Sequence, residues 1–350
     1  MSAVTRENWP EQIESEDQLD ELLTRPSEPL LRFIKTVSSP LLILGAGGKM
    51  GPTLAVLAKR AALAANHPLD VVAVSRFSDN QAQEWLEKNG VKTLSRDLLL
   101  TDSLDQLLET ENIIYLVGLK FGTAKNPAAT WAMNTIVPAR VAERFPRARV
   151  VALSTANVYP LSDVNRGGSV EGDPLTPLGE YANAAIGRER IFEFYSRRDH
   201  VAVALLRLHY AVELRYGVVV DIARKIHARE PISLANGYFS CIWQGDANEM
   251  ILRSLSLPAS PPSIWNLCRR EIFSVRDVAL QLGELLGTRP EFDGSEEPTA
   301  LLSNSDRLCT RLGTPSVSLE TMLPWIADWV KQHRRDLGRP THFEERDGNY

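Results

Sequence analysis

Short apolar runs alternate with longer amphipathic segments through much of this 350-residue chain. The apolar runs have the length of strands, and the segments between them carry apolar residues every three or four positions, as helices do. Strands and helices in alternation predict an α/β fold in which helices cover both faces of a parallel sheet. The strand-like runs are Leu41–Leu44, Asp70–Ser75, Asn112–Val117, Arg149–Ser154 and Val201–Leu206, and the helical segments are Thr53–Ala65, Asn80–Lys88, Thr130–Phe145 and Leu178–Arg197.

The alternation ends after Arg207, where shorter runs and proline-rich stretches begin. This change of rhythm favours a second, smaller unit that is assembled from the later part of the chain. The elements expected there are helices at Tyr216–Ala228, Ser274–Leu286 and Leu319–Gln332 and a strand at Ser263–Leu267.

A glycine-rich turn joins the first strand-like run to the first long helical segment. Glycines stand at Gly45, Gly48 and Gly51, so the spacing is G-x-x-G-x-x-G rather than G-x-G-x-x-G. Glycine permits tight backbone angles and the close approach of a pyrophosphate, and the following helix N-terminus offers free N–H groups to phosphates. Strand, turn and helix in this order favour dinucleotide binding over an ordinary glycine-rich turn.

We therefore expect a Rossmann-type doubly wound parallel sheet with a smaller C-terminal α/β substrate-binding cap. Residues 40–207 would form the NAD(P)-binding domain, and residues 208–335 mainly the cap, with some return to the sheet. Residues 1–39 carry amphipathic patterns at Glu16–Leu23 and Pro29–Val37, read as packed helices, with a flexible leader as the alternative. Residues 336–350 are polar and are expected to be a loose tail.

Composition excludes several classes of protein. The net charge is −5 with both signs interspersed, which speaks against nucleic acid or an anionic membrane as a partner. The start of the chain is acidic without an apolar core of signal-peptide type, and no apolar run could span a bilayer. The cysteines, Cys241, Cys268 and Cys309, are odd in number and far apart, as expected of buried reduced thiols in a cytoplasmic protein. Scattered histidines argue against a metal site.

Further motifs follow the glycine turn in a fixed order: Asp97-Leu98, Asn134, the stretch Ser154-Thr155-Ala156-Asn157-Val158-Tyr159, the run Pro177-Leu178-Gly179-Glu180-Tyr181, and Glu189. Together they resemble the extended short-chain dehydrogenase/reductase family, the NAD(P)-dependent sugar epimerases and dehydratases, over about Pro40–Val330. More narrowly, Lys120-Phe121-Gly122, Gly187-Arg188-Glu189-Arg190 and Trp243-Gln244-Gly245-Asp246 resemble a little-characterised bacterial subgroup for which no substrate is implied.

The resemblance implies a reaction type and a set of site residues. Hydride would move between nicotinamide C4 and a substrate carbon, with Tyr181 transferring the oxygen-bound proton and Thr155 holding that oxygen. The cofactor-binding residues that it implies are Gly45, Gly47, Gly48, Lys49, Met50, Gly51, Ser75, Arg76, Asp97, Leu98, Val117, Gly118, Asn134 and Tyr181.

One departure concerns the family's Tyr-x-x-x-Lys, in which the Lys binds the nicotinamide ribose and stabilises the Tyr phenolate. The corresponding position here is Ala185. A substitute cation is one interpretation, with Lys120 favoured over Arg188. Alternatively, Tyr181 serves only as a neutral acid, or catalysis is lost. A free tyrosine has a pKa of about 10, so little phenolate exists at neutral pH without a nearby cation.

A second departure concerns the substrate. The family often has Leu-Arg-x-x-Asn-Pro after its sixth strand, and the Asn helps to bind a nucleotide-diphosphate sugar. Tyr210 and Ala211 stand in the Asn and Pro places, so we expect no such substrate. The candidate substrate residues are Tyr159, His209, Tyr210, Arg215 and Trp243, with core packing as the alternative for His209 and Trp243.

Cofactor choice is suggested at the end of the second strand. An acidic residue there would accept hydrogen bonds from the adenosine ribose and select NAD. The sequence has Ser75 and Arg76 instead, and Arg76 with Lys49 would suit the 2′-phosphate of NADP.

The sequence thus predicts a cytoplasmic, NADP-dependent oxidoreductase or epimerase/dehydratase acting on a sugar-like or polyhydroxylated small molecule. A catalytically silent NADP-binding sensor or scaffold is the alternative. The resemblance also implies a homodimer through the helices at Thr130–Phe145 and Leu178–Arg197.

Overall fold

A computed structural model describes residues 9–78, 80–119 and 126–348. Within this part of the chain, a seven-stranded sheet has the order β12-β7-β5-β4-β1-β2-β3, and every neighbouring pair is parallel. The order reverses between β1 and β4, so the carboxyl ends of these strands open a crevice of the kind that binds ligands in doubly wound folds. The strands are β1 (Leu41–Leu44), β2 (Val71–Ser75), β3 (Lys92–Ser95), β4 (Asn112–Tyr115), β5 (Arg149–Thr155), β7 (Ala202–Leu208) and β12 (Ser263–Leu267).

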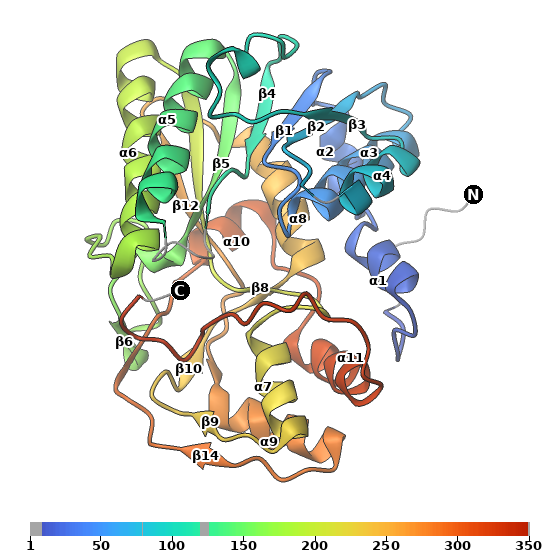
Figure 1. The fold of residues 1–350 in the computed structure, drawn as a ribbon, viewed down its shortest axis with the longest axis vertical. Helices are drawn as coiled ribbons and strands as arrows, with labels where there is room; N and C mark the ends of the chain where they lie inside the picture. Colours follow the sequence, from blue (N-terminus) through green and yellow to red (C-terminus); the bar gives the residue numbers. More distant parts are fainter. Residues whose placement is uncertain (1–8, 79, 120–125, 349–350) are drawn as a thin grey trace.

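Helices cover both faces of this sheet, which confirms the predicted α/β architecture. All four residues of β1 are buried: Leu41 and Ile43 belong to the apolar core on one face, and Leu42 and Leu44 to the core on the other. Because the side chains of a strand alternate, a strand buried on both faces reads as a continuous apolar run. The first core is closed by α2 (Glu28–Ile34), α3 (Gly51–Ala64), α4 (Asn80–Lys88), α8 (Gln244–Arg253) and α10 (Asp306–Leu312), and the second by α5 (Pro127–Arg144) and α6 (Gly179–Asp199), which lie side by side (Figure 1).

The cap has a core of its own. Three helices pack against one another there, below the sheet in Figure 1: α7 (Val218–Ala228), α9 (Val275–Leu286) and α11 (Leu319–Lys331). Short strand pairs flank them, namely β8 (Ala211–Val212) with β11 (Ile242–Trp243), β9 (Ile232–Ser233) with β14 (Phe292–Asp293), β10 (Tyr238–Phe239) with β13 (Phe273–Ser274), and β6 (Ser162–Asp163) with β15 (Thr299–Ala300).

The segment before β1 joins the two cores. α1 (Glu16–Leu23) buries Leu19, Leu22 and Leu23 in the cap core, whereas α2 buries Leu30 and Ile34 against the sheet. Ser15 and Ser27 cap these helices by accepting from the backbone N–H groups three residues on. The described part of residues 1–39 therefore forms packed helices, not a flexible leader.

The expectation of a loose C-terminal tail was wrong. Thr341 and Phe343 are 0% and 3% exposed. The Thr341 N–H and hydroxyl both donate to Asp221 of α7, and the Asn236 side chain donates to the Phe343 carbonyl oxygen at 2.7 Å. Arg346 donates to the carbonyl oxygen and the hydroxyl of Thr299, both at 2.7 Å. The polar composition of the tail suggested a loose segment, but its polar side chains and backbone groups form hydrogen bonds with the cap. The ring of Phe343 is also buried in the cap core.

Candidate cofactor site and active-site cleft

The glycine turn lies directly against the ends of two neighbouring strands. Gly45 has φ +84°, and a Cβ there would be 2.8 Å from the Val117 nitrogen, just beyond β4. A Cβ on Gly47 would be 2.7 Å from the Ser75 hydroxyl at the end of β2. Gly45 must be glycine because its φ is positive and its neighbours are backbone atoms, whereas a side chain at Gly47 would have to displace that of Ser75. The absent side chains let the turn line the crevice between β1 and its neighbours.

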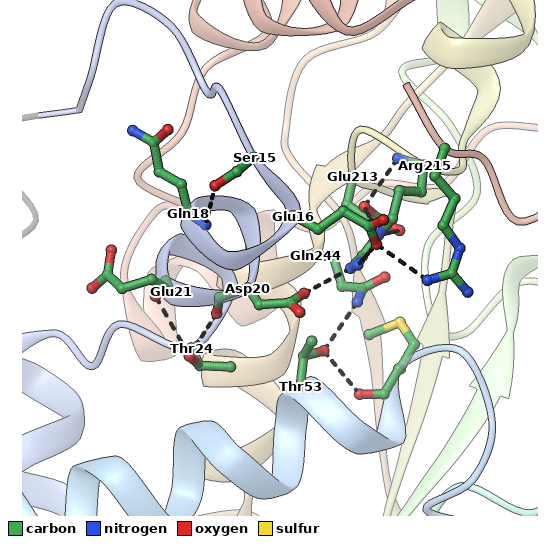
Figure 2. Close-up of polar contacts among 12 residues, drawn as sticks. Ser15, Glu16, Gln18, Asp20, Glu21, Thr24, Thr53, Glu213, Arg215 and Gln244 are labelled. Carbon is green, nitrogen blue, oxygen red and sulfur yellow. Dashed lines mark hydrogen bonds and ion pairs between the residues drawn. The ribbon is translucent and has the colours of Figure 1, made fainter. Parts of the chain in front are cut away.

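The helix after the turn is held in place from the side. α3 begins at Gly51, with Met50 as its N-cap. The hydroxyl of Thr53 in its first turn accepts a hydrogen bond from Gln244 of α8 at 3.0 Å (Figure 2). It also accepts from Asn248 of α8 at 2.9 Å and donates to the Met50 carbonyl oxygen. The positive end of the α3 dipole therefore has a fixed position at the crevice, as phosphate binding requires.

The residues expected near adenosine follow β2 and β3 at the same edge of the sheet. The side chain of Arg76 is exposed. The Asp97 carboxylate accepts from the Leu99 N–H at 3.0 Å, and Leu98 is buried in the core on the α5 and α6 face. The structure thus gathers Ser75, Arg76 and Asp97 at the ends of adjacent strands, with Asp97 fixing a turn.

Lys49 extends from the turn towards the cap. Its ammonium donates to the carbonyl oxygen of Ala211 in β8 at 2.6 Å and lies 4.0 Å from the centre of the Tyr216 ring. In this arrangement its charge is engaged on the cap side of the turn. The sequence predicts that Lys49 and Arg76 together meet the 2′-phosphate of NADP, because the direction of a lysine side chain cannot be inferred from its place in the sequence.

The candidate acid–base pair lies where β5 meets α6. Thr155 ends β5, and its hydroxyl donates to the Asn157 side-chain oxygen at 2.8 Å and accepts from the Asn157 N–H at 3.2 Å. Tyr181 lies half-buried in the first turn of α6, which packs on the 3₁₀ turn Ala156–Val158. Burial chiefly raises the pKa of Tyr216, and Asp221 and then Tyr181 raise that pKa further.

The position of the absent lysine is filled by apolar packing. Ala185 is fully buried and clusters with Ala156, Val158 and Tyr159. Lys120, the cation that the sequence favoured as a substitute, lies outside the described residues.

Arg188 is the cation that the structure brings to this edge of the sheet. It is 5% exposed, and its Nη1 donates to the Val117 carbonyl oxygen at 2.9 Å and to the Asn134 side-chain oxygen at 3.0 Å. Asn134 in turn donates to the Thr130 carbonyl oxygen. Val117, Gly118 and Asn134 were each expected at the cofactor site, and the structure assembles them around this guanidinium.

Tyr159 belongs to a buried polar network rather than to an open surface. Its hydroxyl donates to the Asn266 side-chain oxygen at 2.8 Å and accepts from Arg207 at 2.8 Å. Burial raises the pKa of Tyr159 to about 12, against the opposing effect of Arg207. The network continues to Glu189, which binds Arg207 and the Ser154 hydroxyl.

Arg215 is held by carboxylates, as Figure 2 shows. Its guanidinium bonds Asp20 at 2.9 Å and Glu16 at 3.1 Å, both on α1, and Glu213 at 3.2 Å. These contacts make Arg215 a link between the N-terminal helix and the cap, and Arg215 also lines a cavity of the cap that is described below. The sequence gave no signal for this partnership, since almost 200 positions separate α1 from Arg215.

Two further candidate substrate residues lie inside the protein. Trp243 is 0% exposed in the cap core, with its ring 5.7 Å from that of Trp325. His209 is 2% exposed and bonds the Ser240 hydroxyl at 2.7 Å. Both placements agree with the core-packing alternative. Tyr210 is half-buried and stacks on His209, with ring centres 4.5 Å apart.

The C-terminal tail lines one side of a cavity of about 340 Å³ in the cap. Tyr216, Asp221 and Arg224 line it from α7 and the loop before it, and Arg339 and His342 line it from the tail. The tail then runs to the first turn of α6, where Gly348 packs against the backbone of Gly179 (Figure 1). The path of the tail thus links the cap to the helix that carries Tyr181.

Other kinds of site find no support in the described residues. No group of three or more His, Cys, Asp or Glu side chains there could hold a metal ion. No helix in that part of the chain is long and apolar enough to cross a membrane. Cys241, Cys268 and Cys309 are free and buried. Burial raises the pKa of Cys241 and raises that of Cys268 to about 11, so these two thiols are poor nucleophiles.

Comparisons with known proteins identify the fold. A scan of protein-family models and a search of curated protein sequences gave no match. Solved structures do match. MoeE5 in complex with UDP-glucose and NAD has a TM-score of 0.68 at 20% identity, covering 85% of this chain and 99% of that one. UDP-glucuronic acid 4-epimerase from Bacillus cereus in complex with NAD has 0.69 at 18%, covering 84% and 96%.

A third similar structure is the UDP-glucose 4-epimerase of Thermotoga maritima with UDP-glucose, with a TM-score of 0.67 at 17% identity, covering 84% of this chain and 99% of that one. At these identities the likeness establishes the fold. It confirms the Rossmann-type sheet with a cap, the fold that the sequence predicts.

Proposed function

We propose that this protein binds a nicotinamide dinucleotide and is an oxidoreductase or epimerase/dehydratase of the extended short-chain type. The observation that carries the proposal is the lining of the crevice between β1 and β4. Gly47 lies against Ser75, Gly45 against Val117, and Gly118 against Arg188, so each approach depends on an absent side chain. Two of the similar solved structures contain NAD, at 20% and 18% identity, which supports the class of ligand.

Different residues would bind different parts of the cofactor. The turn from Gly45 to Gly51 and the N-terminus of α3 would hold the diphosphate, and Ser75 with Arg76 the adenosine ribose. Bound nicotinamide supplies the hydride donor or acceptor. Tyr181 would move the proton on the substrate oxygen, and Thr155 would hold that oxygen by a hydrogen bond.

A glycine variant tests this proposal without disturbing the fold. A Cβ on Gly48 would have only the Gly45 carbonyl oxygen, at 3.5 Å, within contact distance. We therefore expect Gly48→Val to fold and to obstruct the space proposed for the diphosphate. Titration with NADPH and NADH by fluorescence should show saturable binding to the wild type and none to Gly48→Val. Gly172→Val is the matched control, because a Cβ there has nothing within 4 Å. A wild type that binds neither cofactor would refute the proposal.

For the substrate, we infer a sugar-like or polyhydroxylated small molecule rather than a nucleotide sugar. Tyr210 and Ala211 replace the Asn-Pro that would hold a nucleotide. The cavity under the tail, about 340 Å³, is at the lower end of the range for ligand pockets, roughly 300–1,000 Å³. The similar solved structures that contain UDP-sugars give the competing expectation.

A thermal-shift screen in the presence of NADPH separates these substrate classes. The screen would compare free sugars, sugar acids and lactones with UDP-glucose and UDP-glucuronic acid. We expect a saturable response within the first group. A micromolar response to the UDP-sugars alone would overturn the substrate inference and leave cofactor binding intact.

Ala185 favours a second candidate function, a nucleotide-binding sensor or scaffold without catalysis. The buried alanine at this position carries no charge and lies in an apolar cluster, where the family has its lysine. If NADPH binds but no substrate in the screen is turned over, and Tyr181→Phe leaves every binding constant unchanged, this second function is the better description.

We also infer a homodimer formed through α5 and α6, in a reducing, cytoplasmic setting. Exposed apolar side chains on these helices include Trp131, Ile136 and Phe194, which are 39%, 43% and 53% exposed. Such residues are typical of helix pairs that are covered in an assembly. Light scattering on a sizing column would measure the mass, and Phe194→Glu should convert a dimer into a monomer. A monomeric wild type contradicts this inference.

A further inference from the structure

Arg188 carries a buried charge that forms no ion pair with a carboxylate among the described residues. Among the described residues, the arginines in the buried class are Arg188, Arg207 and Arg269. Arg207 is paired with Glu189 at 2.7 Å and Arg269 with Glu271 at 2.7 Å. For Arg188 the recorded partners are the neutral oxygens of Val117 and Asn134. Because a buried and unpaired charge is costly, its retention suggests that a ligand completes its environment.

The guanidinium also has unused donors. Both recorded hydrogen bonds are made by Nη1, and Nε is buried with no partner among the described residues. The hydroxyl of Tyr115, at the end of β4, is likewise buried without a partner in that part of the chain. Burial raises the pKa of Tyr115, and the charge of Arg188 acts against that rise.

A chain of close contacts places Arg188 at the crevice. A Cβ on Gly45 would be 2.8 Å from the Val117 nitrogen, and a Cβ on Gly118 would be 2.7 Å from Arg188 Nη1. Val117, just beyond β4, is the residue that contacts the glycine turn, and Gly118 follows it. The absent side chain of Gly118 therefore leaves space for the Arg188 guanidinium. In a doubly wound fold, the half of the crevice at β4 and β5 receives the second mononucleotide, which in NAD(P) is the nicotinamide half.

Helix geometry explains how a residue so far from Tyr181 reaches this place. Seven residues span almost two turns of α6, so Arg188 lies on the same face as Tyr181. Side chains on a helix lean towards its N-terminus, so a long arginine extends back towards the turn that contains Ala185. Because position 185 is an alanine and not a lysine, the side chain of Arg188 from the following turn can extend along this face of the helix.

We propose that Arg188 binds the nicotinamide half of the cofactor and supplies there the positive charge that Ala185 cannot. The proposal rests on the proposed function, because it needs a nicotinamide dinucleotide in the crevice. It replaces Lys120 by a cation whose place in the fold is described. Arg188 acts as a donor to polar oxygens of the ligand, since its guanidinium keeps its charge at all physiological pH values.

The test compares the whole cofactor with its adenosine half. Arg188→Met should weaken NADPH binding about tenfold or more, the scale for losing a charge-assisted hydrogen bond, whereas ADP should bind to Arg188→Met as it does to wild type. Arg188→Lys, which keeps the charge, should bind NADPH within about threefold of wild type. Arg190→Met is the matched control, because Arg190 is exposed on the same helix and paired with Glu193 at 2.7 Å.

Each outcome has one meaning. If wild type binds neither NADPH nor NADH, the proposed function fails, and the inference with it. If wild type binds NADPH and Arg188→Met binds it equally well, only the inference is overturned. Equal losses of ADP and NADPH affinity in Arg188→Met would show a structural role and would also overturn it. Gly118→Ala gives a second route, since its Cβ would displace Nη1 while the arginine remains, and it should weaken NADPH binding but not ADP binding.

Discussion

The carboxylate of Glu189 accepts two hydrogen bonds from the guanidinium of Arg207, from Nε at 3.0 Å and from Nη2 at 2.7 Å. Both side chains are at most 5% exposed. The pair joins α6 to β7, and so holds the helix that carries Tyr181 against the sheet. It also fixes the Tyr159 hydroxyl, which accepts from Arg207.

Breaking this buried pair from one side should destabilise the protein strongly. Arg207→Met leaves the Glu189 charge buried and unpaired, and we expect a loss of about 3–5 kcal/mol in the free energy of unfolding, measured in urea. The double variant Glu189→Gln/Arg207→Met should lose less than the sum of the single variants, because neither then leaves a lone charge. Additive losses would mean that the pair is not coupled.

The N-terminal helix should make stability depend on pH through Asp20. Burial raises the pKa of Asp20 above its usual value, although Arg215 opposes that rise. An acid with a raised pKa binds its proton more tightly in the folded state than in the unfolded one. Its contribution is therefore most favourable below the usual pKa of about 3.9 and is lost as the pH rises through the folded pKa. Asp20→Asn should flatten the unfolding free energy across that window in urea titrations at several pH values. An unchanged pH profile would contradict the burial effect.

The cofactor preference should be NADPH over NADH by more than tenfold. Arg76 is exposed at the end of β2, where a charge-assisted hydrogen bond to the 2′-phosphate is worth roughly 1.5–3 kcal/mol. Arg76→Ala should abolish most of the preference in a fluorescence titration. Lys88→Ala is the control, because Lys88 is an exposed cation at the far end of α4. Equal affinities in the wild type would refute the NADP assignment.

Loss of the Tyr181 hydroxyl should reduce turnover by two or more orders of magnitude, the scale of proton-transfer assistance. Tyr181→Phe and Thr155→Ala would be assayed with a substrate from the thermal-shift screen, and NADPH should still bind to both. Tyr238→Phe on the cap serves as a control tyrosine. Lys120→Ala in the same assay decides whether that residue contributes, and little change is expected if Arg188 supplies the charge. Unchanged turnover in Tyr181→Phe would refute its catalytic role.

The tail should contribute measurably to stability. Phe343 is 3% exposed in the cap core, so Phe343→Ala should cost about 3 kcal/mol in the free energy of unfolding. Glu345→Ala, on an exposed side chain of the same segment, should change it little. Equal and small effects of both substitutions in urea unfolding would restore the original expectation of a loose tail.

The local pattern of the chain was enough to locate most elements that surround the site. The helices predicted at Glu16–Leu23 and Asn80–Lys88 and the strands predicted at Leu41–Leu44 and Ser263–Leu267 have those bounds in the structure. These segments are determined by periodicity and by neighbouring turn residues, which act over a few positions. The glycine turn could be predicted for the same reason, since the positive φ of Gly45 is a local backbone requirement.

Only the tertiary structure determined which groups the long charged side chains contact. Arg188 lies within two turns of Tyr181 in sequence, yet its role depends on Val117, Gly118 and Asn134, which packing brings to it. The sequence alone favoured Lys120, because that residue follows the fourth strand. Lys49 was likewise assigned to the adenosine side, whereas its hydrogen bond is to Ala211, 162 positions away.

The sequence by itself therefore determined the layers, the glycine turn and the edge of the sheet at which a ligand would bind. The tertiary structure decided which charges meet there, that α1 engages Arg215, and that the tail spans from α7 to the start of α6. The physical reason is that backbone periodicity and turn geometry are local, whereas the partner of a long charged side chain is chosen by burial among segments that are distant along the chain.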